Sequence, residues 1–405
     1  MHNFKQRSHS YGRKWNGSKT NARSFNQQSF SRSLKKQKQL DSNLFVRKTV
    51  QNTKAWQKPE SNIQFSEYAI SDKLKRNIKE HGYISPTPIQ EKTIPHILAL
   101  RDVIGIANTG TGKTAAFLIP LINKAYSDRN QRTLIITPTR ELAMQILDEF
   151  TIFSKVLNLD AGLCIGGANI QRQEKNLHHH PHFVIGTPGR LKDLIKRQKL
   201  NLMLFQNIVL DEVDRMVDIG FIKDVQYLIS LLAKKRQSLF FSATVSGKTQ
   251  DILRQFVSNA VTVSVKQQET AENVEQDIIK VANRGIKIDT LHNLLIKEEF
   301  IKVLIFGKTK WGIEKLTKEL ILRGFKAASI HGNKSQGQRQ RALAQFKQDE
   351  LQILLATDVA SRGLDIDNVT HVINYDTPAS YEDYIHRIGR TGRAGKKGFA
   401  LTFVE

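Results

Sequence analysis

The sequence has one cysteine and no long apolar run, and both shortages restrict what the protein can be. Cys164 has no partner for an internal disulfide or a cysteine-based metal site, which fits a reducing compartment. We expect it to be a small, buried apolar residue. The most apolar stretches, such as AAFLIPLI, are far shorter than the roughly 18–20 residues that span a bilayer. We therefore expect a soluble, cytoplasmic protein without a membrane segment.

Acidic residues are scarce in the first 60 positions, which hold 14 lysines and arginines against only Asp41 and Glu60. This segment accounts for half of the net charge of +24 and has almost no aliphatic periodicity. Because it cannot bury enough apolar surface, we expect it to be disordered. Its seven aromatic residues are suited to stacking on nucleobases between the cations. The aromatic residues are Phe4, Tyr11, Trp15, Phe25, Phe30, Phe45 and Trp56.

A chain of 405 residues is too long for one ordinary core, and its pattern divides it further. Short apolar runs alternate with helical stretches from about residue 61, which predicts α/β units with parallel sheets. The polar segment 265–276 interrupts this rhythm and is the best linker candidate. We therefore predict two similar α/β domains, 61–264 and 277–405, after a basic tail of residues 1–60. Ligands are expected at the carboxyl ends of the strands.

The stretch DVIGIANTGTGKT runs from a predicted strand through a glycine-rich turn into a helix. Gly110 and Gly112 allow backbone amides to surround phosphate oxygens, and Lys113 supplies a positive charge to them. Thr114 offers a hydroxyl to Mg²⁺. The usual pattern begins with glycine where this chain has Ala107. We interpret the stretch as a nucleoside triphosphate site.

A second apolar run, NIVLDEVD, ends in three carboxylates that would repel one another if they were packed without a cation. With a phosphate site upstream, Asp211 is predicted to hold the Mg²⁺ that Thr114 also binds. Glu212 would orient or deprotonate the attacking water. Asp214 would bridge to neighbouring polar groups and sense the ligand.

Phosphoryl transfer also requires cations that neutralise developing charge, and arginine is well suited to this role. The stretch YIHRIGRTGRAG places Arg387, Arg390 and Arg393 three residues apart, late in the second predicted domain. If that domain supplies these arginines to the nucleotide, hydrolysis occurs only when the two domains close.

Together these motifs make the chain resemble the DEAD-box RNA helicases, a family of two RecA-like domains that remodel RNA with ATP. The resemblance covers about residues 62–405, with the motifs in the family's order, and it makes Ala107 an ordinary variant of the phosphate loop. DEVD carries Val213 where the family has alanine, which we expect to tune the activity without abolishing it.

The resemblance assigns roles around the nucleotide. GYISPTPIQ resembles the adenine-recognising motif, which implies that Gln90 contacts the base edge and that Phe65 stacks on the base. Asp365 is implied to contact the ribose or the arginine fingers, which are Arg390 and Arg393. His386 and Arg387 are implied to link the domains, and Asp214, Ser242 and Thr244 to couple hydrolysis to strand separation. The phosphate-loop residues implied to bind ATP are Thr109, Gly110, Thr111, Gly112, Lys113 and Thr114.

The resemblance also implies an RNA-binding surface that reads sugar and phosphate, with little sequence preference. Arginines would neutralise phosphates, and glycines would allow close approach of the backbone. In the first domain the implied residues are Pro138, Thr139, Arg140, Gly166, Gly167, Thr187, Gly189 and Arg190. In the second domain they are Gly332, Gln336, Arg339, Thr357 and Arg362.

Two other functions fit parts of the pattern. A DNA translocase would differ in the polymer that stimulates hydrolysis, and a passive RNA clamp or annealing chaperone would lack ATPase activity.

The histidine-rich stretch LHHHPHF suggests metal binding at first sight, but cysteines and acids are absent nearby and Pro181 disrupts regular spacing. We therefore expect solvated histidines there.

Deletion of residues 1–60 is expected to lower RNA affinity and to flatten its dependence on salt. Each lost phosphate contact to a single strand should reduce the slope of log affinity against log salt by about 0.7. The slope can be measured by fluorescence anisotropy with a labelled RNA between low and moderate salt. An unchanged slope would remove the electrostatic role assigned to the tail.

Overall fold

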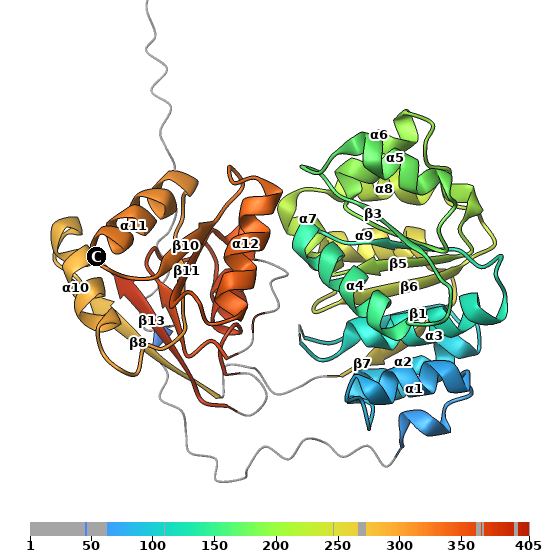
Figure 1. Cartoon of the computed structure of the whole chain (residues 1–405), viewed down its shortest axis with the longest axis horizontal. Helices are drawn as coiled ribbons and strands as arrows, with labels where there is room; N and C mark the ends of the chain where they lie inside the picture. Colours follow the sequence, from blue (N-terminus) through green and yellow to red (C-terminus); the bar gives the residue numbers. More distant parts are fainter. Residues whose placement is uncertain are drawn as a thin grey trace, which may run out of the picture. The chain divides into compact units, whose positions relative to one another are not determined.

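A computed structural model of the chain describes residues 45–46, 63–108, 110–245, 247–265, 273–361, 366, 368–392 and 396–404. These residues all belong to the larger of two compact units, Leu40–Glu405. They form two α/β domains, each built around one sheet (Figure 1). Every strand pair in both sheets is parallel, as the continuous apolar runs predict.

The first domain contains a seven-stranded sheet in the order β3-β4-β2-β5-β6-β1-β7. Its strands are β1 (Val103–Ile106), β2 (Thr133–Ile136), β3 (Ala161–Cys164), β4 (Phe183–Gly186), β5 (Asn207–Asp211), β6 (Gln237–Ser242) and β7 (Val261–Ser264). The helices are α1 (Asp72–Glu80), α2 (Pro88–Leu98), α3 (Lys113–Ser127), α4 (Arg140–Phe153), α5 (Ile170–His178), α6 (Pro188–Lys196), α7 (Val213–Ile219), α8 (Ile222–Ser230) and α9 (Gly247–Phe256). Short 3₁₀ turns lie at η2 (Phe65–Glu67) and η3 (Leu202–Leu204).

Successive residues of each strand in this sheet belong to two different apolar cores. On β5, for example, Val209 packs in one core with α2, α3 and α4. Its neighbours Ile208 and Leu210 pack in the other core with α6, α7, α8 and α9. Helices thus cover both faces of the sheet, which leaves the ends of the strands as the place where polar side chains gather.

The second domain contains a six-stranded sheet in the order β10-β11-β9-β12-β13-β8. Its strands are β8 (Val274–Lys280), β9 (Val303–Phe306), β10 (Ala327–Ile330), β11 (Ile353–Ala356), β12 (His371–Asn374) and β13 (Gly398–Val404). The helices are α10 (Arg284–Leu295), α11 (Lys310–Leu322), α12 (Gln336–Lys347), α13 (Asp358–Ser361) and α14 (Tyr381–Ile388). Again two apolar cores occupy the two faces of the sheet.

The structure corrects the predicted linker and adds to the prediction for the tail. Strand β8 begins at Val274, so residues 274–276 belong to the second sheet and not to the linker 265–276. Within the tail predicted to be disordered, Phe45 is described and only 1% exposed. Val46 is described as well and is 46% exposed, and the other residues of that tail lie outside the described residues.

Phe45 packs against the second domain in a small apolar cluster with Val274, Tyr384, Ile388 and Ala400. Its ring centroid lies 4.7 Å from that of Tyr384 on α14. The Tyr384 hydroxyl donates to the Phe45 carbonyl at 3.5 Å. An aromatic residue that the sequence suggested for nucleobase stacking is thus used here for packing.

Two predictions made from scarce residue types can be checked in the part of the chain that the structure describes. Cys164 is buried at the end of β3, and burial raises the pKa of its thiol to about 12, so it is a packing residue and not a reactive thiol. None of the described helices combines the length and the apolar character that a membrane crossing requires.

Phe45→Ala is expected to destabilise the second domain, because burial of a phenylalanine side chain contributes about 1.5–3 kcal/mol. The free energy of unfolding can be measured by urea titration of the full-length chain. Val46→Ala, at an adjacent position that is 46% exposed, is the matched control and should leave stability unchanged. Equal midpoints for the two variants would show that the Phe45 contact contributes no stability.

Candidate functional site

The predicted phosphate loop connects β1 to α3 and turns through two left-handed glycines. Gly110 has φ of 81° and Gly112 has φ of 88°, values that residues with a side chain rarely adopt. A side chain at Gly112 would also collide with the amide of Gln90. The Thr111 hydroxyl donates to the carbonyl of Asn108 at 2.8 Å, which closes the loop. The backbone is therefore shaped to turn its amides toward an anion at the start of α3.

Gln90 joins the predicted adenine-recognising motif to this loop. Its side-chain nitrogen donates to the Gly112 carbonyl at 2.9 Å, and its oxygen accepts from the Thr87 backbone amide at 2.9 Å. The Thr87 hydroxyl donates to the Thr111 carbonyl at 2.8 Å. These bonds connect residues 87–90 directly to the loop. The proposed contact of Gln90 with a base, and that of Phe65, which is buried beside Tyr68, stay predictions.

The Lys113 ammonium and the Asp211 carboxylate face the same place from different elements. Lys113 begins α3 and donates to the Ala107 carbonyl at 2.8 Å. Asp211 ends β5, is 2% exposed, and its Oδ1 has no hydrogen-bond partner among the described residues. Burial raises the pKa of Asp211 to about 7, aided by Glu212 and opposed by the charge of Lys113.

Glu212 is held in a strained backbone conformation directly after Asp211. Its φ of 52° and ψ of 51° are left-handed, which costs a residue with a side chain about 1–2 kcal/mol. Its Oε2 accepts from Arg215 Nη1 at 2.8 Å, and both side chains are buried. The buried ion pair holds the carboxylate in one orientation. Val213, where the family has alanine, packs fully inside an apolar core.

Asp214 connects the start of α7, directly after β5, to the end of β6. Its Oδ2 accepts from the backbone amides of Ala243 and Thr244 at 3.1 and 3.0 Å, and from the Thr244 hydroxyl at 3.3 Å. Ser242 donates its hydroxyl to the Thr244 carbonyl at 2.7 Å. The structure therefore brings Asp214, Ser242 and Thr244 together, and their role in coupling stays a prediction.

Arginines and glycines predicted to bind RNA come together at the ends of β2, β3 and β4. The Arg140 guanidinium lies against the backbone of Gly166 and Gly167, where a Cβ on Gly166 would lie 3.0 Å from Arg140 Nη2. Arg190 on α6 donates to the Ala168 carbonyl at 3.2 Å. Thr139 and Thr187 are the residues that precede α4 and α6. Pro138 precedes Thr139 and Gly189 lies in the first turn of α6.

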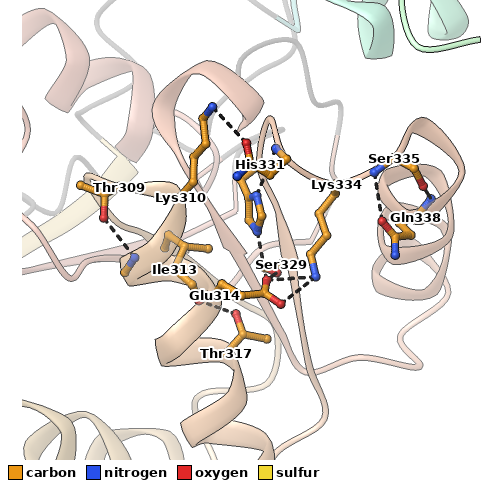
Figure 2. A network of polar contacts seen from close by, with 12 residues as sticks. Thr309, Lys310, Ile313, Glu314, Thr317, Ser329, His331, Lys334, Ser335 and Gln338 are labelled. Carbon is orange, nitrogen blue, oxygen red and sulfur yellow. Dashed lines mark hydrogen bonds and ion pairs between the residues drawn. The ribbon is translucent and has the colours of Figure 1, made fainter. Parts of the chain in front are cut away.

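In the second domain, the predicted RNA-binding residues also follow strands at one edge of the sheet. Gly332 lies in the loop after β10, Gln336 and Arg339 lie in the first turn of α12, and Thr357 follows β11. A Cβ on Gly332 would lie 3.4 Å from Cε of Lys310. Figure 2 shows Lys310 reaching toward this loop from the start of α11, a cation that the sequence prediction did not include.

Arg387 is buried in the second domain, and its guanidinium connects several elements by hydrogen bonds. Its Nε and Nη2 donate to the two carboxylate oxygens of Asp358 at 2.6 and 2.8 Å. Its Nη1 donates to Asn374 Oδ1 at 3.1 Å and to the Asp376 carbonyl at 2.7 Å. These bonds join α14 to α13 and to the end of β12. The predicted linking of the two domains by Arg387 and His386 stays a prediction.

One of the two predicted arginine fingers is among the described residues. Arg390 lies two residues beyond α14 and is buried. Thr109, Arg362, Asp365 and Arg393 lie outside the described residues. Among the described residues, no group of three histidines, cysteines or acids is arranged to hold a metal ion, and this includes the histidine-rich stretch after α5.

Two family models match the chain in the order of its two domains. The DEAD/DEAH box helicase model matches residues 87–252, and the helicase conserved C-terminal domain model matches residues 286–395. The chain belongs to the DEAD-box RNA helicase family.

Similar proteins support this membership. The ATP-dependent RNA helicase CshA of Limosilactobacillus reuteri is 45% identical over 84% of this chain and 69% of its own length. The DEAD-box helicase CshA of Bacillus licheniformis is 44% identical over 84% of this chain and 70% of its own. Among solved structures, S. cerevisiae Dbp5 bound to RNA and ADP BeF₃ has a TM-score of 0.74 at 30% identity, over 84% of this chain and 89% of that one. Mss116p bound to ssRNA and AMP-PNP has a TM-score of 0.76 at 29% identity, over 86% of this chain and 76% of that one.

Sequence reasoning missed three residues that the site depends on, namely Thr87, Arg215 and Lys310. Thr87 and Gln90 have the threonine-x-x-glutamine spacing of a capping box, so their pairing could have been read from the sequence. Arg215 lies three residues after Glu212, which is ion-pair spacing on a helix. No pattern in the sequence around Lys310 could have indicated its place, because its partner Asn333 lies in the loop after β10.

Asp211→Asn is expected to stabilise the nucleotide-free protein above pH 7. In the folded protein the pKa of Asp211 is raised from 3.8 to about 7. Between about pH 4 and pH 7 the folded protein therefore keeps a proton on Asp211 that the unfolded chain has released. Stability consequently falls as the pH rises through this range. Asparagine removes this loss, for a gain of about 1–3 kcal/mol at pH 8 that disappears near pH 4. Thermal unfolding without nucleotide or Mg²⁺ at both pH values measures it, with Asp251→Asn on the exposed side of α9 as control. A gain that is equal at both pH values would contradict the buried-charge explanation.

Proposed function

We propose that this ATP-dependent RNA helicase binds ATP at the carboxyl edge of the first sheet and couples its hydrolysis to local remodelling of RNA. The single observation that carries the proposal is the arrangement around the phosphate loop. Lys113, Asp211 and Glu212 converge there, and Asp214 connects the same edge to Ser242 and Thr244. Such an arrangement supplies the parts that hydrolysis of a phosphoric anhydride requires.

The residues present fit a magnesium ion beside the triphosphate. Asp211 offers a buried carboxylate oxygen without a hydrogen-bond partner among the described residues, and Thr114 offers a hydroxyl in the first turn of α3. Hard oxygen ligands of this kind suit Mg²⁺. When bound, the ion would neutralise charge on the phosphate oxygens.

The protein's own groups then position the reactants. The turned amides of the phosphate loop and the Lys113 ammonium hold phosphate oxygens, and Glu212 accepts a proton from the attacking water or orients it. Arg215 keeps the Glu212 carboxylate in one orientation through their 2.8 Å ion pair. Arg390 and Arg393 of the second domain are proposed to complete the site when the domains close, and Asp365 to contact the ribose or these arginines.

RNA is proposed to bind along the strand ends of both domains through its backbone. Arg140 and Arg190 lie beside backbone segments of glycine and alanine in the first domain, where a phosphate can approach closely. Contacts of this kind give little sequence preference. We propose that the basic tail adds electrostatic affinity, that the protein works in the cytoplasm, and that the domain boundaries are those predicted from the sequence except at β8.

Lys113→Ala and Glu212→Gln are each expected to reduce RNA-stimulated ATP hydrolysis at least 100-fold. The first removes the positive charge that holds the phosphate oxygens, and the second removes the carboxylate that orients or deprotonates the attacking water. Phosphate release should be measured with RNA, with DNA and with no polymer. Glu80→Gln, at an exposed carboxylate near the end of α1, is the matched control and should behave as the unmodified protein.

The same assay separates the alternatives. Unchanged turnover in both variants would exclude these residues from the active site. Equal stimulation by DNA would indicate a DNA translocase, and absence of hydrolysis with every polymer would indicate a passive RNA clamp.

A further inference from the structure

A carboxylate with three different donors lies in the second domain, outside the set of residues assigned to ATP or RNA. Glu314 lies on α11 and accepts from the Ser329 hydroxyl at 3.0 Å and from His331 Nε2 at 3.0 Å. The Lys334 ammonium lies 3.1 Å from its Oε1 and 2.9 Å from its Oε2. Figure 2 shows these side chains converging on the Glu314 carboxylate from β10 and from the loop that follows it. The His331 and Lys334 bonds lower the pKa of Glu314 to about 2.

The hydrogen bonds around His331 define its tautomer. The backbone amide of Asn333 donates to His331 Nδ1 at 3.3 Å, so this nitrogen is an acceptor. The other nitrogen, Nε2, faces the Glu314 carboxylate and therefore carries the hydrogen. A neutral imidazole satisfies both contacts and connects α11 to the backbone of the loop. The amide of Lys334 donates to the carbonyl of His331 at 3.0 Å, which closes the turn between them.

This loop, residues 331–335, contains Gly332 and leads into α12, which contains the other predicted RNA-binding residues of this region. Its far end is fixed by Ser335, whose hydroxyl accepts from the Gln338 amide at 3.3 Å. The Gln338 side chain accepts in return from the Ser335 amide at 3.0 Å. Lys310 donates to the Asn333 side chain at 3.2 Å on the exposed side of the loop. Both ends of the loop are thus fixed, and Glu314 contacts its first residue, His331, and its fourth, Lys334.

We propose that Glu314 is a positioning residue for RNA binding, which holds the loop 331–335 through His331 and Lys334 so that the Gly332 backbone and the Lys310 ammonium face the RNA phosphates. The inference rests on the proposed function, because it needs RNA to bind at this edge. Without Glu314, the loop loses its anchor at Ser329, His331 and Lys334 together. RNA binding then has to order the loop, and that cost reduces affinity.

The proposal predicts an effect whose sign is opposite to that of simple electrostatics. Removal of an acid from a surface that faces phosphates should strengthen RNA binding if the acid only repels the polymer. Removal of an anchor should weaken it. Glu319 provides a matched comparison, since it lies on the same helix, carries the same charge and pairs only locally with Arg323 at 3.0 Å among the bonds described.

The test measures RNA-stimulated ATPase activity of the full-length protein as a function of RNA concentration, at saturating ATP. We expect Glu314→Ala to raise the KM for RNA about tenfold, while kcat at saturating RNA and the KM for ATP stay within about twofold. Glu314→Gln should raise it by less, because its amide oxygen still accepts from Ser329 and His331 but forms no ion pair with Lys334. Glu319→Ala should leave the KM for RNA unchanged or slightly lower.

The outcomes separate this inference from the proposed function. An unmodified protein whose ATPase does not respond to RNA would remove the proposed function itself. A responsive protein in which Glu314→Ala has an unchanged or lower KM for RNA would overturn the positioning role alone. Thermal unfolding of each variant shows whether the second domain stays folded. If Glu314→Ala unfolds, Glu314→Gln decides, and an unchanged KM for RNA in that variant overturns the inference.

Discussion

Three neighbouring parallel strands, β5, β6 and β1, end side by side, and the proposed ATP site depends on this register. Ile106 at the end of β1 pairs with Ser242 at the end of β6, and Asp211 at the end of β5 pairs with Phe241. The loops that follow β1 and β6 are more than a hundred residues apart in the sequence, yet they begin next to one another in the fold. A shift of one strand by a single residue would turn its polar end toward an apolar core.

The acids gathered at this edge are stabilised in three different ways, and the difference indicates their roles. Asp214 has its donors within the fold, and Glu212 has a buried arginine. Among the described residues, Asp211 alone of these three has a fully buried oxygen without a hydrogen bond, and burial opposes its charge. A carboxylate of this kind is unfavourable in the resting protein and becomes favourable when a cation arrives. In the second domain, Glu314 is the contrasting case, since its donors are already in place.

How much could be predicted from the sequence differs between kinds of feature. The phosphate loop and the acidic strand end were predicted because their chemistry is local and depends on spacing. The strands β3, β7 and β8 lack a continuous buried apolar run, and all three lie at sheet edges, where one side has no neighbouring strand and polar residues are tolerated. The environment of Arg387 could not be predicted, since its partners Asp358 and Asn374 come from separate elements. The packing of Phe45 depends likewise on a cluster assembled only by the fold.

The bond between Lys113 and the Ala107 carbonyl has a consequence for the catalytic cycle. The ammonium has an acceptor inside its own loop, so binding of a phosphate oxygen would exchange one acceptor for another. This exchange reduces the net gain from capturing a triphosphate. It equally reduces the free-energy cost of releasing the diphosphate product. The loop therefore favours repeated turnover over tight binding of the nucleotide.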